Sequence, residues 1–319
     1  MRECKASSEV SWALTLGVAL LMCVASVRPA RAQANTASFP HGTLELIAEN
    51  PGIEKREIAA GQEFDVGLRF QLEKGWHIYW VNPGDSGEPP RVEWRLPSGL
   101  STGAIEWPTP RRLENSSSIV DYGYEDAVLL MVPMHADPRL AAERATQIGA
   151  DVKLLVCSHE MCIPGKAQLS LTLPIGAHVS AHPYSPYANL FADTRRSLPR
   201  PAPGNWKLSV ADANGSFVIT MNVDHKIVSQ AITQATFFPL AESQVDNAAP
   251  QKMQTVASGF RLTLRKSDQL LKPIERLKGV LVVSGDHSNL NQSFLLDVPV
   301  GKPGAARNGP RPKSTRYNN

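Results

Sequence analysis

Two cysteines separated by four residues carry the clearest chemical signal in the sequence. Cys157 and Cys162 lie in the segment 154–164, which reads LLVCSHEMCIP. An apolar run leads into Cys157 and an alternating run follows Pro164, so we expect the pair at the neck of a β-hairpin, where two Cβ atoms approach within the roughly 4 Å that a disulfide requires. Pro164 has no N–H to donate, which favours the edge of a sheet. An edge position leaves the sulfurs open to another protein.

Three interpretations of the pair stay open at this point. A structural disulfide closing so short a ring would stabilise the fold by only about 2 kcal/mol, which is little for a chain of this size. Metal binding would use Cys157, His159, Met161 and Cys162, all soft ligands suited to copper or zinc. Redox exchange needs an accessible pair and a neighbouring group that favours the thiolate.

The amino terminus has the pattern of a secretory signal peptide. Arg2 and Lys5 precede an apolar run over 12–27, and small residues follow at Ala30 and Ala32. A basic start, a short apolar centre and a small-x-small ending are typical of a cleaved leader. We therefore expect cleavage after Ala32 and export to the periplasm.

Removal of this leader would change the cysteine count. Cys4 and Cys23 lie within it, and lipidation of Cys23 is disfavoured because residues 20–22, Leu-Leu-Met, lack the small residue that normally precedes a lipidated cysteine. The exported protein would keep only Cys157 and Cys162. It would occupy a compartment where disulfides form and persist.

The composition of the chain limits the kinds of partner that we expect for it. The formal net charge of +3 over 319 residues gives no reason to expect nucleic acid. No segment after the leader approaches the roughly 20 apolar residues of a membrane span, so we expect a soluble chain. No cofactor motif is visible, and none is predicted.

Period-two alternation dominates the rest of the chain and predicts an all-β protein. Gly, Pro, Asn and Asp clusters interrupt the alternating runs, as at 82–85 and 214–215, which favours antiparallel sandwiches. Short helices are expected only at 138–144 and 187–196. The clearest predicted strands are 64–72, 92–96, 167–173, 217–223 and 260–264.

A cluster of prolines predicts the domain boundary. Five of them fall between 183 and 203, in a stretch with few apolar residues that is typical of a stiff linker. The expected organisation is a signal peptide (1–32), a redox β-sandwich (33–182), a Pro-rich linker (183–204), a second β domain of sandwich type (205–300) and a disordered basic tail (301–319).

Motifs in the first domain resemble a known family. The segment 74–79, KGWHIY, is followed by YGYED at 122–126 and then by the cysteine hairpin at 156–164. In this order they make the stretch 61–174 similar to the amino-terminal periplasmic domain of the thiol:disulfide interchange protein DsbD, and still more to its ScsB-type relatives.

The resemblance implies an immunoglobulin-like sandwich that relays electrons from a thioredoxin-like donor to periplasmic disulfide proteins. It implies that Cys157 forms the mixed disulfides and Cys162 resolves them. It places His77 and Tyr79 beside the sulfurs, and it makes the segment 115–122, ending at Tyr122, a lid over the pair.

This sequence departs from the family pattern in two respects. The cysteines are separated by four residues instead of five, so the hairpin loop must differ. The membrane domain and the thioredoxin domain of full-length DsbD are missing, so we expect a separate membrane reductase or a soluble thioredoxin-like donor.

The other neighbours of the pair have plain alternatives. His77 is either a half-buried strand residue or a group that favours the thiolate when protonated and assists proton transfer. His159, inside the cysteine loop, would lower the thiol pKa of Cys157, while Glu160 would oppose it. Tyr79 and Tyr122 are more often packing residues.

Two functions follow from these observations. The first is a protein-disulfide reductase that exchanges electrons through Cys157 and Cys162. The alternative is a non-enzymatic adaptor with a structural or copper-binding cysteine pair. The second β domain shows no diagnostic constellation, so docking or spacing is its default role.

Overall fold

The computed structural model describes residues 34–49, 58–59, 61–114, 118–139, 145–176, 186–223, 232–285 and 292–301. The expected signal peptide lies outside these residues, as do the basic tail beyond Gly301 and most of the short helix expected at 138–144. Among the described residues, no helix is long and apolar enough to cross a membrane.

The first sheet contains five antiparallel strands in the order β1-β2-β4-β10-β7. Its centre is β4, where the alternation read from the sequence is confirmed, because Phe64, Val66, Leu68 and Phe70 are all buried. The strands are β1 (Thr36–Phe39), β2 (Gly42–Glu49), β4 (Glu63–Leu72), β7 (Leu100–Thr102) and β10 (Ala127–Ala136).

The second sheet has the order β3-β12-β11-β5-β9-β8, with β6 also paired to β11. All its pairings are antiparallel except the short one between β3 and β12. The strands are β3 (Ile58–Ala59), β5 (His77–Gly84), β6 (Arg91–Arg95), β8 (Arg111–Glu114), β9 (Val120–Glu125), β11 (Ala145–Cys157) and β12 (Cys162–Gly176).

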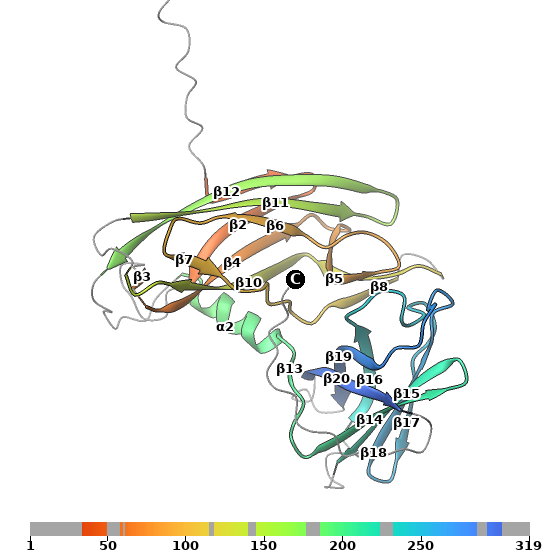
Figure 1. Cartoon of the computed structure of the whole chain (residues 1–319). Helices are drawn as coiled ribbons and strands as arrows, with labels where there is room; N and C mark the ends of the chain where they lie inside the picture. The colour runs from red at the N-terminus through yellow and green to blue at the C-terminus, as the bar shows by residue number, and fades with distance from the viewer. Residues whose placement is uncertain are drawn as a thin grey trace, which may run out of the picture. The chain divides into compact units, whose positions relative to one another are not determined.

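The two sheets bury one hydrophobic core between them (Figure 1). Leu68 and Phe70 reach it from the first sheet, and Ile78, Trp80 and Val152 reach it from the second. Both sheets thus present every second residue to a shared interior, the arrangement of an immunoglobulin-like sandwich. The predicted fold class is confirmed.

One helix packs on the outer face of the first sheet. It is α2 (Ala188–Ser197), close to the expected position at 187–196. Phe191 is fully buried against Ile47, Leu129 and Met131. Arg195 forms ion pairs with Glu49 and Asp65. The Pro-rich segment expected to be an extended linker therefore contains a helix anchored to the sandwich.

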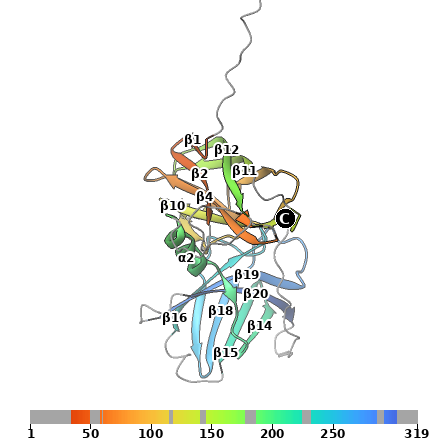
Figure 2. The ribbon, with the colours of Figure 1, turned by 90° about the vertical axis from the view of Figure 1, so that its left-hand side faces the viewer.

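The third sheet follows α2 and has the order β16-β19-β20-β14-β15-β18-β17, with β13 also paired to β20 (Figure 2). Residues from both halves of this sheet share one core, so the sheet curls on itself. The strands are β13 (Arg200–Pro201), β14 (Trp206–Ala213), β15 (Ser216–Val223), β16 (Ile232–Pro239), β17 (Lys252–Val256), β18 (Gly259–Arg265), β19 (Arg276–Gly285) and β20 (Gln292–Gly301).

The third sheet also contributes to the core of the first sandwich. Phe238 and Val280 belong to the same buried cluster as Trp80. The ring of Phe238 lies edge-on to Trp80 and Tyr122, with centroids 6.3 and 5.1 Å away. The Asn82 side chain donates a hydrogen bond of 2.8 Å to the carbonyl of Pro239. The described residues between Ala34 and Gly301 accordingly form one compact unit.

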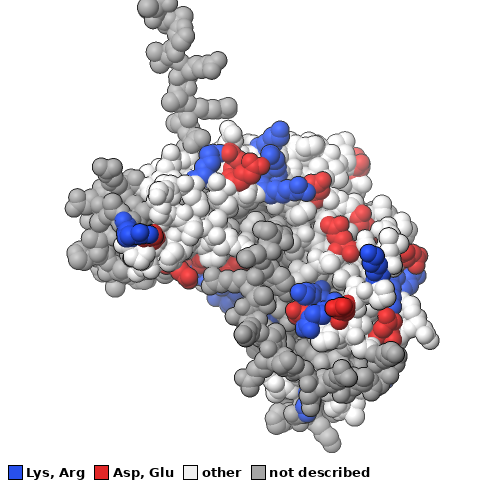
Figure 3. All heavy atoms as spheres, viewed as in Figure 1, with Lys and Arg blue, Asp and Glu red and all other residues white. Residues whose placement is uncertain are grey.

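Charged side chains of both signs are interspersed on the face drawn in Figure 3. In the described structure, oppositely charged side chains also pair across strands, as Lys153 does with Glu93 and Arg276 with Asp297. This face presents no large field of one sign, in keeping with the nearly balanced composition.

The shared aromatic cluster leads to a stability prediction. Phe238→Ala removes a ring that is 5% exposed, leaving a cavity among Trp80 and Tyr122. We expect the free energy of unfolding to fall by about 3–5 kcal/mol, measured by urea denaturation. Leu271→Ala is the control, because Leu271 is 91% exposed and should change stability by less than about 0.5 kcal/mol. Equal effects of the two substitutions would contradict the packing role of Phe238.

Candidate redox site

The cysteine pair closes the hairpin between β11 and β12. Cys157 and Cys162 face each other as the last pair of this ladder, with Cα atoms 4.1 Å apart, and they form a disulfide. Ser158 shapes the loop between them. Its N–H donates to the carbonyl of Met161, and its Oγ accepts from the N–H groups of Glu160 and Met161. The hairpin predicted from the sequence is confirmed.

The two cysteines differ in exposure. Cys157 is 1% exposed, because β5 pairs with β11 on the other side at His77. Cys162 is exposed. Among the described strands, β12 pairs on its outer side only with β3, at Ile175 and Gly176, far from the cysteines. A partner's thiolate therefore reaches Cys162 more readily than Cys157. This favours the reverse of the order that the family resemblance implied.

Strand β5 places two side chains on the cysteine face of the sheet. Ile78 and Trp80 point into the core, so His77 and Tyr79 point to the opposite face, which Cys157 shares because it is paired with His77. The Tyr79 hydroxyl lies 3.7 Å from Cys162 Sγ. The rings of His77 and Tyr79 meet edge-on, with centroids 5.1 Å apart. Both predicted neighbours are thus brought to the pair.

Burial determines the charge state of both groups. Desolvation, helped by the nearby charge of His159, lowers the pKa of His77 to about 4. His77 is therefore neutral at neutral pH, which disfavours the idea that a protonated His77 promotes the thiolate. Desolvation also raises the pKa of Tyr79 to about 12. Tyr79 consequently keeps its proton and can donate a hydrogen bond to a thiolate at Cys162.

The loop residues between the cysteines face solvent. His159 and Glu160 are exposed, and Met161 is 53% exposed. Met161 therefore adds an apolar contact point directly beside Cys162. The described residues contain no group of three or more His, Cys, Asp and Glu side chains arranged to hold a metal ion.

Tyr122 does not join the group around the sulfurs. It lies in β9 with its ring in the core, where its hydroxyl donates a hydrogen bond of 2.8 Å to Asn247. Of the expected lid, residues 115–117 lie outside the described part of the chain. Ile119 is 41% exposed, whereas Val120 is buried in β9. The lid thus stays a prediction.

The sequence reading missed the residues that cover Tyr79. They form the segment 85–87, which follows β5. Ser86 donates from its N–H and its hydroxyl to the two carboxylate oxygens of Asp121, at 2.9 and 2.8 Å. The turn signal at 82–85 was visible, but nothing in it pointed to Asp121, a carboxylate in a strand 35 residues away.

Comparison with known protein families assigns this domain. Residues 46–174 match the family described as "Thiol:disulfide interchange protein DsbD, N-terminal". The family recognised from the sequence motifs is confirmed for this segment, which carries a domain of the DsbD amino-terminal type. No match was found among curated protein sequences.

Solved structures extend the likeness beyond this segment. The N-terminal periplasmic domain of ScsB from Proteus mirabilis is similar with a TM-score of 0.57 and 14% identity, over 84% of this chain and 100% of that one. At this identity the likeness shows the fold alone. The periplasmic chaperone SfaE (7% identity, 81% of this chain, 98% of that one) and a Porphyromonas gingivalis W83 protein of unknown function (13%, 80%, 99%) match with TM-scores of only 0.21.

The buried histidine predicts a pH dependence of stability. In the unfolded chain His77 takes up a proton near pH 6.5, whereas in the folded protein its pKa is about 4. Between these values the unfolded state binds more protons, so the free energy of unfolding should fall as the pH drops from about 6.5 to about 4, by up to about 3 kcal/mol. Urea denaturation across this range measures the fall.

Two variants assign this dependence to one residue. His77→Phe should flatten the pH profile over this window, because it removes the group that titrates. His135→Phe is the matched control, because His135 is exposed on β10, and it should retain the slope. An unchanged slope in a folded His77→Phe protein would refute the assignment.

Proposed function

We propose that this protein is a periplasmic thiol–disulfide exchange protein that relays electrons from a thioredoxin-like donor or a membrane reductase to periplasmic disulfide proteins. The observation that carries the proposal is the contrast within the disulfide: Cys162 is exposed at an edge where no described strand pairs with it beyond β11, and Cys157 is buried behind it. The match of residues 46–174 to the DsbD amino-terminal family supports the same chemistry.

The exchange proceeds in two displacements. A thiolate of the reduced donor attacks Cys162 Sγ, which forms a mixed disulfide and releases Cys157 as a thiolate. The donor's second thiolate then attacks the donor sulfur that is bonded to Cys162. This closes the donor's own disulfide and releases Cys162 as a thiolate. The donor is then oxidised and the pair is reduced. The reverse sequence passes the two electrons to a disulfide of the acceptor, again through Cys162.

The neighbouring groups assist this chemistry without adding charge. The neutral hydroxyl of Tyr79 donates to the thiolate of Cys162 and favours its formation. Neutral His77 faces Cys157 across the β5–β11 pairing, so it places no positive charge beside that sulfur and leaves Cys157 to act as the resolving thiol. Met161, beside Cys162, offers an exposed apolar contact for a partner protein.

Trapping of the intermediate tests the order of the cysteines. Cys157→Ser removes the resolving thiol and leaves the exposed Cys162, whose thiolate attacks the disulfide of an oxidised thioredoxin-like protein, so we expect a long-lived mixed disulfide. Cys162→Ser leaves only the buried Cys157, and the yield of adduct should be lower by about tenfold or more. Mass spectrometry of non-reduced samples counts the adducts. Equal yields would contradict the proposed order, and absence of adducts from both variants would contradict the relay.

Reduction of the disulfide tests the structural alternative. The bond closes a ring with a sequence separation of 5, so its loss should lower the free energy of unfolding by only about 2 kcal/mol. Thermal and urea unfolding of the oxidised and reduced forms, in metal-free buffer, gives the difference. Collapse of the fold on reduction would instead assign the bond a structural role.

A further inference from the structure

The segment 85–87 lies directly on the ring of Tyr79. A Cβ atom added at Gly87 would lie 2.0 Å from Tyr79 Cζ, and Gly87 has a φ of +82°. Only glycine allows so close an approach in this backbone conformation. The backbone at Gly87 and Cys162 Sγ thus contact the same side chain, with the ring of Tyr79 between them.

Two carboxylates hold this segment to β9. Asp121, which is fully buried, accepts both hydrogen bonds of Ser86. Asp85 accepts a hydrogen bond of 2.8 Å from the N–H of Val120. The segment is therefore fixed at two successive residues immediately before Gly87.

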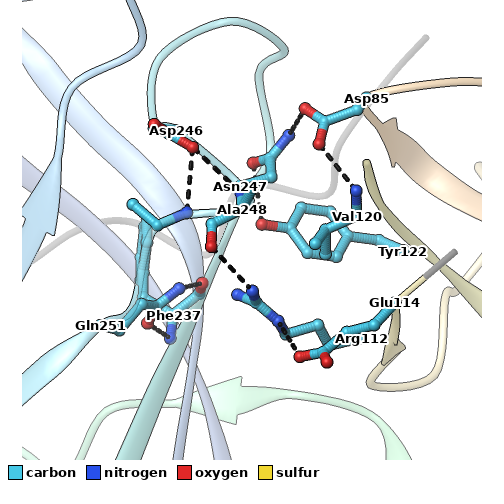
Figure 4. A network of polar contacts seen from close by, with 11 residues as sticks. Asp85, Arg112, Glu114, Val120, Tyr122, Phe237, Asp246, Asn247, Ala248 and Gln251 are labelled. Atoms are coloured by element: carbon cyan, nitrogen blue, oxygen red, sulfur yellow. Dashed lines mark hydrogen bonds and ion pairs between the residues drawn. The ribbon is translucent and has the colours of Figure 1, made fainter. Parts of the chain in front are cut away.

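The loop between β16 and β17 supplies a further anchor, drawn in Figure 4. The Nδ2 of Asn247 donates to the other oxygen of Asp85 at 2.8 Å, and the Oδ1 of Asn247 accepts from the hydroxyl of Tyr122. Asn247 is only 5% exposed. Its own loop is held by Asp246, which accepts from the N–H groups of Ala248 and Ala249. A continuous set of contacts thus runs from this loop to Cys162.

We propose that Asn247 is a positioning residue for the redox centre, acting through Asp85 and the segment 85–87 on Tyr79. The loop at 246–249 holds that segment against the Tyr79 ring, and the ring holds its hydroxyl beside Cys162 Sγ. The third sheet thereby stabilises the thiolate of Cys162. This inference rests on the proposed exchange at Cys162.

The test follows the ionisation of Cys162 itself. In the Cys157→Ser background, the rate of iodoacetamide labelling at Cys162 is measured across pH by peptide mass spectrometry. Asn247→Ala should lower the acid dissociation constant of the Cys162 thiol about threefold to tenfold, because the hydrogen bond from Tyr79 is weakened. Tyr79→Phe should lower it by a similar factor.

A double-mutant cycle separates positioning from general damage. If Asn247 acts through Tyr79, Asn247→Ala should add no further change in a Tyr79→Phe protein. Arg112→Ala is the matched control: it removes the hydrogen bond from Arg112 to the carbonyl of Ala248 in the same interface, without a bond to the segment 85–87. It should leave the ionisation of Cys162 unchanged. Gly87→Ala, which displaces the Tyr79 ring directly, replaces Asn247→Ala if that variant fails to fold.

Other ionisable groups near Cys162 do not confound the comparison. Tyr79 and His77 face it from β5, Glu125 lies opposite His77 on β9, and His159 and Glu160 lie in the cysteine loop. All except Tyr79 are the same in every variant, so their effects cancel.

An unchanged ionisation in folded Asn247→Ala, or a shift that persists in the Tyr79→Phe background, would overturn the proposal. So would an equal shift in Arg112→Ala. The labelling needs no partner protein, so these outcomes are distinct from a failure to trap a mixed disulfide.

Discussion

The burial of β5 on both faces is the constraint on which the rest of the structure depends. His77, Ile78, Tyr79 and Trp80 are each no more than 4% exposed. Because neighbouring residues of a strand point to opposite faces, Ile78 and Trp80 fill the sandwich core while His77 and Tyr79 lie against the cysteine hairpin. Any displacement of this strand therefore affects the core and the redox site together.

The same burial explains the electrostatics of the site. Removing His77 and Tyr79 from water disfavours their charged forms, which makes both neutral near neutral pH. Cys162 consequently has an uncharged hydrogen-bonding neighbour in Tyr79, and the His77 ring on the face of Cys157 is uncharged as well. A neutral phenol that donates to a thiolate stabilises it without the desolvation cost of an ion pair. This arrangement suits the thiol–disulfide exchange that we propose for the pair.

The third sheet and its loops contribute both to the core of the sandwich and to the surroundings of the cysteine pair. Phe238 completes an aromatic cluster with Trp80 and Tyr122. Asn247 donates a hydrogen bond to Asp85, the residue that directly follows β5. Packing and hydrogen bonding therefore meet at the strands β5 and β9. The family match ends at residue 174, before the third sheet begins, whereas the structural likeness to the ScsB domain covers 84% of the chain.

The sequence by itself determined the strands, the cysteine hairpin and the position of His77 and Tyr79, because these depend on local alternation or on motifs in a fixed order. Only the tertiary structure decided the unequal exposure of Cys157 and Cys162, which depends on strand order: β5 covers one cysteine, and no strand among the described residues pairs beside the other. It also decided that Tyr122 faces the core. The bond between Asp85 and Asn247 joins residues 162 positions apart, and no pattern within a single strand records such a contact.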